Sequence, residues 1–152
     1  MILSAQSIRR RGIISPFNER TIAHGLSFGL SSCGYDVRIK EPVTFRGAFQ
    51  FSLASTIEHF NMPTDVVGRV HDKSTWARRG LAIQNTIIEP GWRGYLTLEL
   101  SNNDRDNTLR IEAGAPIAQI IFELLDYETE APYSGKYMDQ PSCPVGPKLE
   151  HE

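Results

Sequence analysis

The sequence has few cysteines and none of the spacings that build metal sites or disulfide frameworks. Its 152 residues include two cysteines, Cys33 and Cys143, and neither belongs to a CxxC motif or a Cys/His cluster. We therefore expect two reduced thiols rather than a disulfide framework or a structural zinc site. The four histidines show no HExxH or HxE spacing, so the signature of the zinc deaminases is missing. Hydrolytic or deaminating chemistry in this chain is expected to proceed without zinc.

The chain also lacks a basic excess and a long apolar run. Sixteen basic and 18 acidic residues give a net charge of −2. This balance argues against binding to duplex nucleic acid, but it allows a small anionic ligand in a local cationic pocket. No apolar stretch approaches the length that spans a membrane, and the N-terminal residues lack the apolar core of a signal peptide. The sequence predicts a cytoplasmic protein that binds neither nucleic acid nor membrane.

Short alternating segments, separated by Gly, Pro and Asn turns, make up most of the chain. A short helix is expected between Ser4 and Gly12, and 13–22 is expected to be a loop or an edge strand. The pattern predicts an all-β sandwich or barrel, with one domain over residues 1–140 and an irregular tail over 141–152. A polar turn is expected at 102–107, and strands at 34–39, 43–45, 49–53, 56–60, 66–70, 83–88, 95–101, 108–111 and 116–124.

The stretch 71–80 gathers cations and hydroxyls around a short turn of helix. Asp72 or Ser74 can act as its N-cap, and a glycine follows its expected end. Ser74 and Arg78 are four residues apart and therefore share a face. With Lys73 and the free N–H groups of the first turn, they could form a site for an anion. A capped surface helix with solvated cations explains the same pattern, and Trp76 is expected to pack in a core or an interface.

The stretch 88–102 combines a Pro-Gly turn with a strand that carries a carboxylate. Leu98 faces the core, so Glu99 projects from the opposite, polar face, next to Thr97. If that face is covered by a ligand or another subunit, desolvation raises the pKa of Glu99 and suits it to act as a general base. If it is open, Glu99 is an ordinary exposed strand residue. Glu89, just before the turn, is equally open to both interpretations.

Taken in order, these stretches resemble the dCTP deaminase branch of the dUTPase-like superfamily. The similarity runs over residues 1 to about 140 and is most specific in its two central segments. The segments that carry it are Gly34-Tyr-Asp-Val-Arg38, Asp72-Lys-Ser-Thr-Trp-Ala-Arg-Arg-Gly80, Glu89-Pro-Gly-Trp-Arg-Gly94 with Leu98, Glu99 and Asn102, Ala115-Pro-Ile-Ala-Gln119, and Tyr133 with Lys136-Tyr137 and Gln140.

The resemblance implies a distorted β-barrel of jelly-roll-like type that assembles as a homotrimer. It also implies sites between subunits that bind a deoxynucleotide of the dCTP or dUTP type, with Mg2+ carried on the triphosphate. Glu99 matches the catalytic glutamate that activates water, and Ser74 and Arg78 match residues that position the water and polarise the site. The positions that match nucleotide contacts are Lys73, Ser74, Thr75, Arg78, Glu89, Thr97, Leu98, Glu99, Tyr133, Lys136 and Gln140.

The chain departs from the family pattern in its centre. The segment between Arg78 and Glu89, which frames the base, is shorter than in the bacterial deaminases. Glu89 stands where the family has an aspartate that meets the deoxyribose, which is also where dUTPases keep their water-holding acid. The short chain fits a compact or virus-encoded relative, which in the latter case would work in the host cytoplasm.

Three functions follow as hypotheses. The first is hydrolytic deamination of dCTP to dUTP and ammonia, with Glu99 as general base. The second is a diphosphatase that releases pyrophosphate from dUTP or dCTP through a water held by Glu89, alone or together with deamination. The third is a trimer that binds nucleotides as a sensor without turning them over.

Overall fold

A computed structural model describes residues 1–105 and 108–150 of the chain. It confirms the expected all-β fold, with two short helices, α1 (Ala5–Arg11) and α2 (Ser74–Ala77). The strands are β1 (Ile14–Ser15), β2 (Thr21–Ala23), β3 (Leu26–Leu30), β4 (Tyr35–Arg38), β5 (Val43–Phe45), β6 (Gln50–Asn61), β7 (Val66–Asp72), β8 (Leu81–Ile83), β9 (Ile87–Ile88), β10 (Arg93–Asn102), β11 (Leu109–Ile111) and β12 (Pro116–Leu124).

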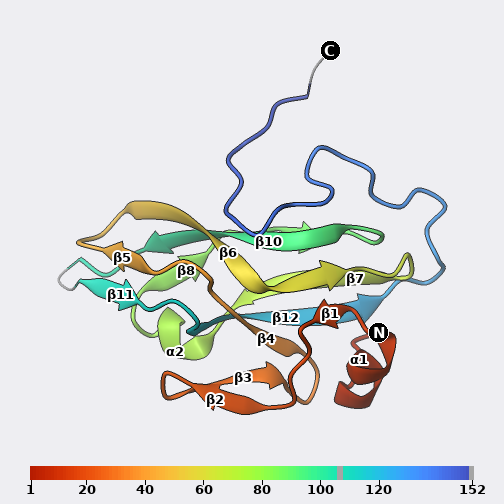
Figure 1. Cartoon of the computed structure of the whole chain (residues 1–152), viewed down its shortest axis with the longest axis horizontal. Coiled ribbons are helices and arrows are strands. Elements are labelled where there is room, and N and C mark those ends of the chain that lie inside the picture. Colours follow the sequence, from red (N-terminus) through yellow and green to blue (C-terminus); the bar gives the residue numbers. More distant parts are fainter. Residues whose placement is uncertain (106–107, 151–152) are drawn as a thin grey trace.

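Within the described residues, the strands form two main sheets and one small ribbon with antiparallel pairing (Figure 1). One main sheet has the order β1-β6-β10-β8, and the other has the order β2-β3-β4-β12-β7-β9. The ribbon consists of β5 and β11. In the part of the chain that the structure covers, no helix is long and apolar enough to cross a membrane.

Three elements differ from the sequence-based expectation. The segments 49–53 and 56–60 belong almost entirely to one strand, β6, because residues 54–55 pair with β10 and the irregularity at 56–58 is a bulge rather than a turn. The expected strand at 83–88 is divided between β8 and β9, which lie in different main sheets. Strand β3 was not expected, because Leu26–Leu30 mixes apolar residues with Ser and Gly. Of the expected polar turn, residues 106–107 lie outside the described residues.

The hydrophobic core is built by the inward-facing residues of the central strands. In β10, Leu98 and Leu100 are fully buried, as the alternation predicts. In β12, Ile117, Ala118, Ile120 and Phe122 are all fully buried, which fits the prediction that this strand is covered on both faces. The core therefore holds β10 rigidly from one side and leaves its polar face for other contacts.

The two main sheets are joined where β6 bulges away from β10. Tyr95 pairs with His59 and Thr97 pairs with Ser55, so residues 56–58 oppose a single residue of β10. The bulge carries Glu58, whose side chain is fully buried. Its carboxylate accepts two hydrogen bonds from Arg38 of β4, from the backbone N–H and from Nε, each at 2.8 Å. Burial raises the pKa of Glu58 even though the Arg38 guanidinium lies beside it.

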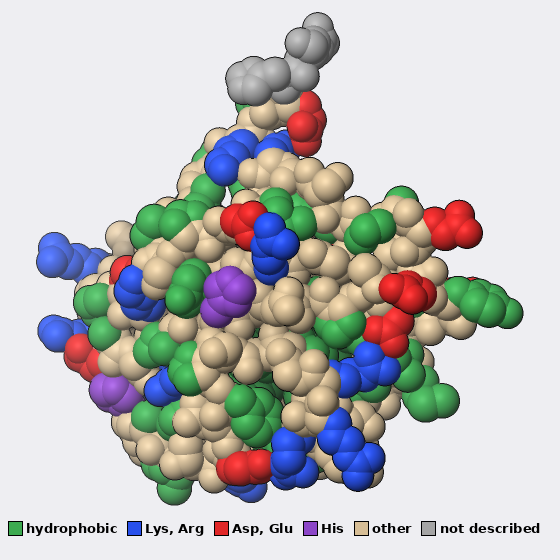
Figure 2. Space-filling model, turned by 45° about the vertical axis from the view of Figure 1, so that its right-hand side comes forward, with side chains coloured by type: hydrophobic (Ala, Val, Ile, Leu, Met, Phe, Trp, Pro, Cys, Tyr) green, Lys and Arg blue, Asp and Glu red, His purple; other side chains and the backbone are tan. Residues whose placement is uncertain are grey.

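Beyond β12 the chain forms an irregular tail that returns to the start of β10 (Figure 1). Gln140 forms a parallel bridge with Gly94, and the Asp139 N–H donates to the Arg93 carbonyl at 2.9 Å. Only glycine suits position 94, because its φ is 144° and a Cβ there would lie 2.6 Å from the Gln140 nitrogen. The last described residues project from the body of the molecule (Figure 2).

Replacing Arg38 by Met is expected to destabilise the fold by about 3 kcal/mol, because the buried Glu58 carboxylate then loses its partner. Urea unfolding of the wild-type protein and the variant at neutral pH measures the difference. The control is Arg110→Met, which breaks the exposed Arg110–Glu112 pair and is expected to leave the unfolding midpoint unchanged. Equal shifts in the two variants would contradict the role of Arg38 in joining the sheets.

The same pair predicts how stability varies with pH. The pKa of Glu58 is raised in the folded protein, so folding holds this proton more tightly than the unfolded chain does. The resulting stabilisation is present below the ordinary pKa of 4.5 and is lost as the pH rises through the raised pKa. We expect the wild-type free energy of unfolding, measured relative to Glu58→Gln, to fall as the pH rises through this range. A difference that does not vary with pH would show that the Glu58 proton is not linked to folding.

Candidate active site

A cavity of about 530 Å³ opens between β10, the segment 84–89 and the tail. The polar face of β10 lines one side, and tail residues line another. Five of the residues singled out in the sequence line this cavity: Glu89, Thr97, Glu99, Tyr133 and Gln140. Among the described residues that line it there is no Lys or Arg. The cavity is therefore mostly apolar, with a few polar groups and two carboxylates, as small-ligand sites commonly are.

Glu99 lies in the middle of β10 with its side chain toward the cavity. Its carboxylate is half-buried, and no described residue forms an ion pair or a hydrogen bond with it. Desolvation raises the pKa of Glu99 above its ordinary value. A carboxylate with a raised pKa and no competing partner can accept a proton from a water molecule in the cavity.

Thr97 connects β10 to the tail. Because the pairing is irregular between Tyr95 and Thr97, both Leu96 and Thr97 line the cavity. The Thr97 hydroxyl donates to Gln140 Oε1 at 2.8 Å and accepts the Val145 N–H at 3.0 Å. The tail thus already touches the polar face of β10 on both sides of this hydroxyl.

Tyr133 fixes the tail against the Pro-Gly turn that precedes β10. Its N–H donates to the Pro90 carbonyl at 2.9 Å, and its hydroxyl accepts the Tyr137 N–H at 3.1 Å. Glu89, just before this turn, is exposed at the edge of the cavity. The cavity therefore carries two carboxylates in different settings, one half-buried in mid-strand and one exposed in a turn.

The cationic segment around α2 does not reach the cavity of its own chain. Ser74, Thr75 and Arg78 are exposed, and none of them lines the cavity. Lys73 is already paired, because its Nζ lies 2.7 Å from Asp36 Oδ2 and both side chains are only 10% exposed. The structure thus separates the site residues predicted from sequence into two groups, one on the cavity and one around α2.

The local structure of α2 corrects one expectation and confirms another. Lys73, rather than Asp72 or Ser74, occupies the N-cap position. Asp72 is engaged elsewhere, since its Oδ1 accepts the Ile83 N–H at 2.8 Å. Trp76 is buried and its Nε1 donates to the Pro116 carbonyl at 2.6 Å, which confirms that it packs in the core.

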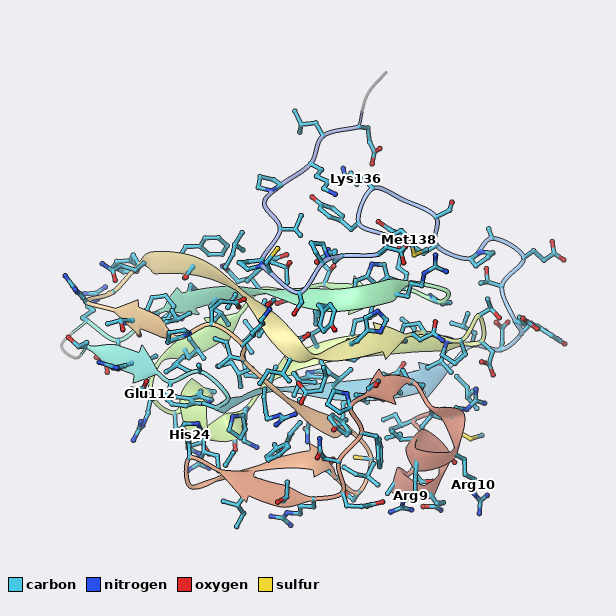
Figure 3. All side chains as sticks on the ribbon, viewed as in Figure 1. Arg9, Arg10, His24, Glu112, Lys136 and Met138 are labelled. Atoms are coloured by element: carbon cyan, nitrogen blue, oxygen red, sulfur yellow. The ribbon has the colours of Figure 1, made fainter. Side chains whose placement is uncertain are left out.

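Two further predicted contacts also lie away from the cavity lining. Lys136 is on the tail, on the outer side of β10 (Figure 3), and its Nζ lies 3.0 Å from Glu150 Oε1. The Leu98 side chain is fully buried in the core and cannot reach a ligand in the cavity. A nucleotide contact of Leu98 is thereby limited to its backbone.

The sequence reasoning missed Asn85 and Trp92. Asn85 lines the cavity, and its side-chain amide binds the backbone of β10 on both sides of Leu98. The available signal was a polar interruption, Gln84–Thr86, inside an otherwise apolar segment. Trp92 also lines the cavity, and its Nε1 donates to the Tyr137 carbonyl at 2.7 Å, which ties the tail to the turn.

In the part of the chain that the structure describes, no three His, Cys, Asp or Glu side chains gather where they could hold a metal ion. Cys33 and Cys143 are exposed free thiols.

Solved structures with the same fold include dUTPases. The EIAV dUTPase aligns with a TM-score of 0.59 at 18% identity, covering 82% of this chain and 97% of that one. The dUTPase of the Staphylococcus bacteriophage 80alpha, solved with dUPNHPP, aligns with a TM-score of 0.57 at 17% identity, covering 80% and 84%. At these identities the likeness establishes the fold alone.

Sequence comparison identifies the family. The model of the dCTP deaminase-like family matches residues 47–125. The dCTP deaminase of Campylobacter fetus subsp. fetus is 36% identical over 89% of this chain and 89% of its own length. The dCTP deaminase of a Wolbachia from Brugia malayi is 35% identical over 85% and 86%. The first alignment spans 167 positions, more than the 152 residues of this chain, so that relative has residues that are missing here. The chain belongs to the dCTP deaminase-like family.

Proposed function

We propose that this protein is an enzyme that hydrolyses dCTP to dUTP and ammonia, with Glu99 as the general base. One observation carries the proposal: Glu99 presents an unpaired, half-buried carboxylate with a raised pKa to the cavity. The relatives that align with this chain over most of their length are dCTP deaminases, which supports a cytosine deoxynucleotide as substrate. No zinc takes part in the proposed reaction.

The reaction needs one water molecule and one proton carrier. Glu99 takes a proton from the water as its oxygen bonds to C4 of the cytosine ring, and a tetrahedral intermediate forms. The protonated Glu99 then gives that proton to the exocyclic nitrogen, and the remaining hydroxyl proton passes to ring N3. The C–N bond breaks, and ammonia leaves as the C4 carbonyl of uracil forms. Hydrogen-bond donors around the intermediate stabilise its developing charge.

A second subunit supplies those donors in our proposal. The cavity lining holds no cation among the described residues, whereas Ser74 and Arg78 are exposed on a different surface of the same chain. In a homotrimer, each cavity receives α2 of a neighbour, so that Ser74 orients the water and Arg78 polarises the site. Lys73 and Thr75 approach the phosphates from the same neighbour, provided that Lys73 exchanges Asp36 for phosphate.

The remaining contacts come from the cavity and the tail. Glu89 meets the deoxyribose, and Thr97 with the Leu98 backbone contacts the sugar and base. Tyr133, Lys136 and Gln140 act at the tail, where Lys136 and Gln140 bind the triphosphate and Mg2+ enters with it. The exposed thiols Cys33 and Cys143 suit a reducing compartment, so we place the reaction in the cytoplasm.

A second candidate function is supported by Glu89. This carboxylate lines the same cavity as Glu99 and is exposed to water. It could hold a water molecule for attack on the α-phosphorus of dUTP or dCTP, which releases pyrophosphate and leaves the base unchanged. A bifunctional enzyme would use both carboxylates in turn.

The first prediction from the proposed function concerns the products. Incubation of the protein with each deoxynucleoside triphosphate and Mg2+ is expected to give ammonia and dUTP from dCTP, identified by mass. Glu99→Gln is expected to lower ammonia release by about 10³-fold, since it removes the general base. The control Glu112→Gln changes an exposed glutamate directly after β11 and is expected to keep the wild-type rate.

Other products of the same assay lead to other conclusions. Pyrophosphate with an unchanged base favours the diphosphatase, and its loss in Glu89→Gln would assign Glu89. Binding of dCTP or dUTP without any product favours a nucleotide sensor. Either result excludes deamination as the function.

The second prediction concerns pH. Glu99 acts as a base only when it is ionised, and desolvation raises its pKa above the ordinary 4.5. We expect kcat/KM for dCTP to rise with pH through a midpoint above this value. Glu89→Gln removes the other carboxylate of the cavity and is expected to keep the same midpoint. A midpoint that disappears in Glu89→Gln would assign the titration to Glu89 instead.

The third prediction concerns the second subunit. Glu99→Gln and Arg78→Ala are each expected to be inactive alone. Random mixing after joint refolding gives about a quarter of the sites an intact Glu99 from one subunit and an intact Arg78 from another. We therefore expect about a quarter of wild-type activity in the mixture. Mixtures without recovered activity would show that both residues act within one chain.

A further inference from the structure

Between β8 and β9 the chain leaves one main sheet and joins the other. β8 pairs with β10 as far as Ile83, which lies opposite Leu100. β9 pairs with β7 from Ile87 onward. Residues 84–86 make this crossing at the wall of the cavity. The last backbone contact to β10 is made by Gln84, whose N–H donates to the Glu99 carbonyl at 2.8 Å.

The crossing leaves two backbone groups of β10 without their regular partners. If the antiparallel ladder continued, the Glu99 N–H would donate to the Gln84 carbonyl, and the Thr97 carbonyl would accept the Thr86 N–H. The Asn85 side chain takes both places. Its Oδ1 accepts the Glu99 N–H at 2.9 Å, and its Nδ2 donates to the Thr97 carbonyl at 2.7 Å.

A side-chain amide is suited to this substitution. It carries an acceptor and a donor on one planar group, as the peptide unit does. The Asn85 amide therefore extends the pairing of β10 by one step after the backbone of the crossing segment has turned away. Without it, two backbone groups beside Glu99 would open toward the cavity, and each would need a water molecule as partner.

The hydrogen bonds of Asn85 run to the backbone of β10, which indicates that this residue positions the strand. The Asn85 oxygen accepts the Glu99 N–H, and one N–H of its NH₂ group donates to the Thr97 carbonyl. Its contacts run to the backbone on both sides of Leu98, whose side chain is anchored in the core. The strand is thus held from the core side by packing and from the cavity side by one amide.

We propose that Asn85 is a positioning residue that fixes the Glu99 carboxylate for catalysis by replacing a missing step of the β-ladder. This inference rests on the proposed function, in which Glu99 activates water. It assigns a role to the segment that departs from the family pattern, since the short crossing requires a side chain to complete the pairing. The consequence for the reaction is a loss of rate, not of substrate affinity, when the amide is removed.

The test uses Asn85→Leu, which keeps the shape of the side chain and removes its donor and acceptor. We expect kcat for dCTP to fall by about 10²-fold through misplacement of the base, while KM stays within about 3-fold of wild type. The amide hydrogen of Glu99, followed by NMR, is expected to exchange at least about 10-fold faster. Asn85→Asp keeps the oxygen that accepts this N–H, so the Glu99 amide is expected to remain protected in that variant.

The matched control is Asn103→Leu, which changes an exposed asparagine at the end of β10 and is expected to leave kcat and the exchange of Glu99 unchanged. Should Asn85→Leu fail to fold, Asn85→Ala serves the same test. The proposal would be overturned if Asn85→Leu kept both the wild-type exchange rate of the Glu99 amide and a kcat within about 3-fold of wild type. A loss of rate that only follows the folded fraction of the variant would overturn it as well. If wild-type protein releases no ammonia, the proposed function fails, and the exchange of the Glu99 amide still shows whether Asn85 holds the strand.

Discussion

The buried contact between Arg38 and Glu58 is the constraint on which the rest of the structure depends. A fully buried carboxylate is unfavourable unless it is paired, and Arg38 supplies both a charge and two hydrogen bonds. This contact fixes the bulge of β6, where residues 56–58 lean from one main sheet toward the other and Thr56 bridges to Ile39. The same bulge breaks the pairing of β10 and turns Leu96 and Thr97 together into the cavity.

A second irregularity lies on the other edge of β10. There the chain crosses from β8 in one main sheet to β9 in the other, and the crossing segment forms part of the cavity wall. Strand β10 is therefore irregular at Leu96 on the β6 edge and at Thr97–Glu99 on the opposite edge, while Thr97 and Glu99 stay regularly paired with β6. Open edges would leave backbone groups of this strand unpaired, but hydrogen bonds with the side chains of Thr56 and Asn85 complete them, the first buried and the others part-buried. Placement of Glu99 thus depends on regular pairing with β6 on one edge and on the Asn85 side chain on the other.

The sequence predicted the regular parts of this arrangement and missed the irregular ones, for a physical reason. Alternation of Leu98, Glu99 and Leu100 reports which face each side chain takes, so the orientation of Glu99 followed directly. A bulge shifts that alternation without a characteristic residue pattern, so β6 was divided into two strands. Asn85 was missed because a polar residue in a short segment looks the same whether it is solvated or completes a ladder. The contact of Arg38 with Glu58 joins residues that are distant in sequence, and neither has a local signal.

Charge explains why the predicted site residues divide into two groups. The cavity lining of the described chain contains two glutamates and no cation. Desolvation therefore raises the pKa of Glu99 without an opposing positive charge in that lining. A triphosphate needs the opposite environment, with several cations close together. Lys136 on the tail lies outside the cavity lining, so in the proposed reaction it can meet phosphates without lowering the pKa of Glu99 from within the cavity. In the proposed trimer, the phosphate end of the site is built by the tail and by a second copy, which leaves the lining around Glu99 within one chain free of cations.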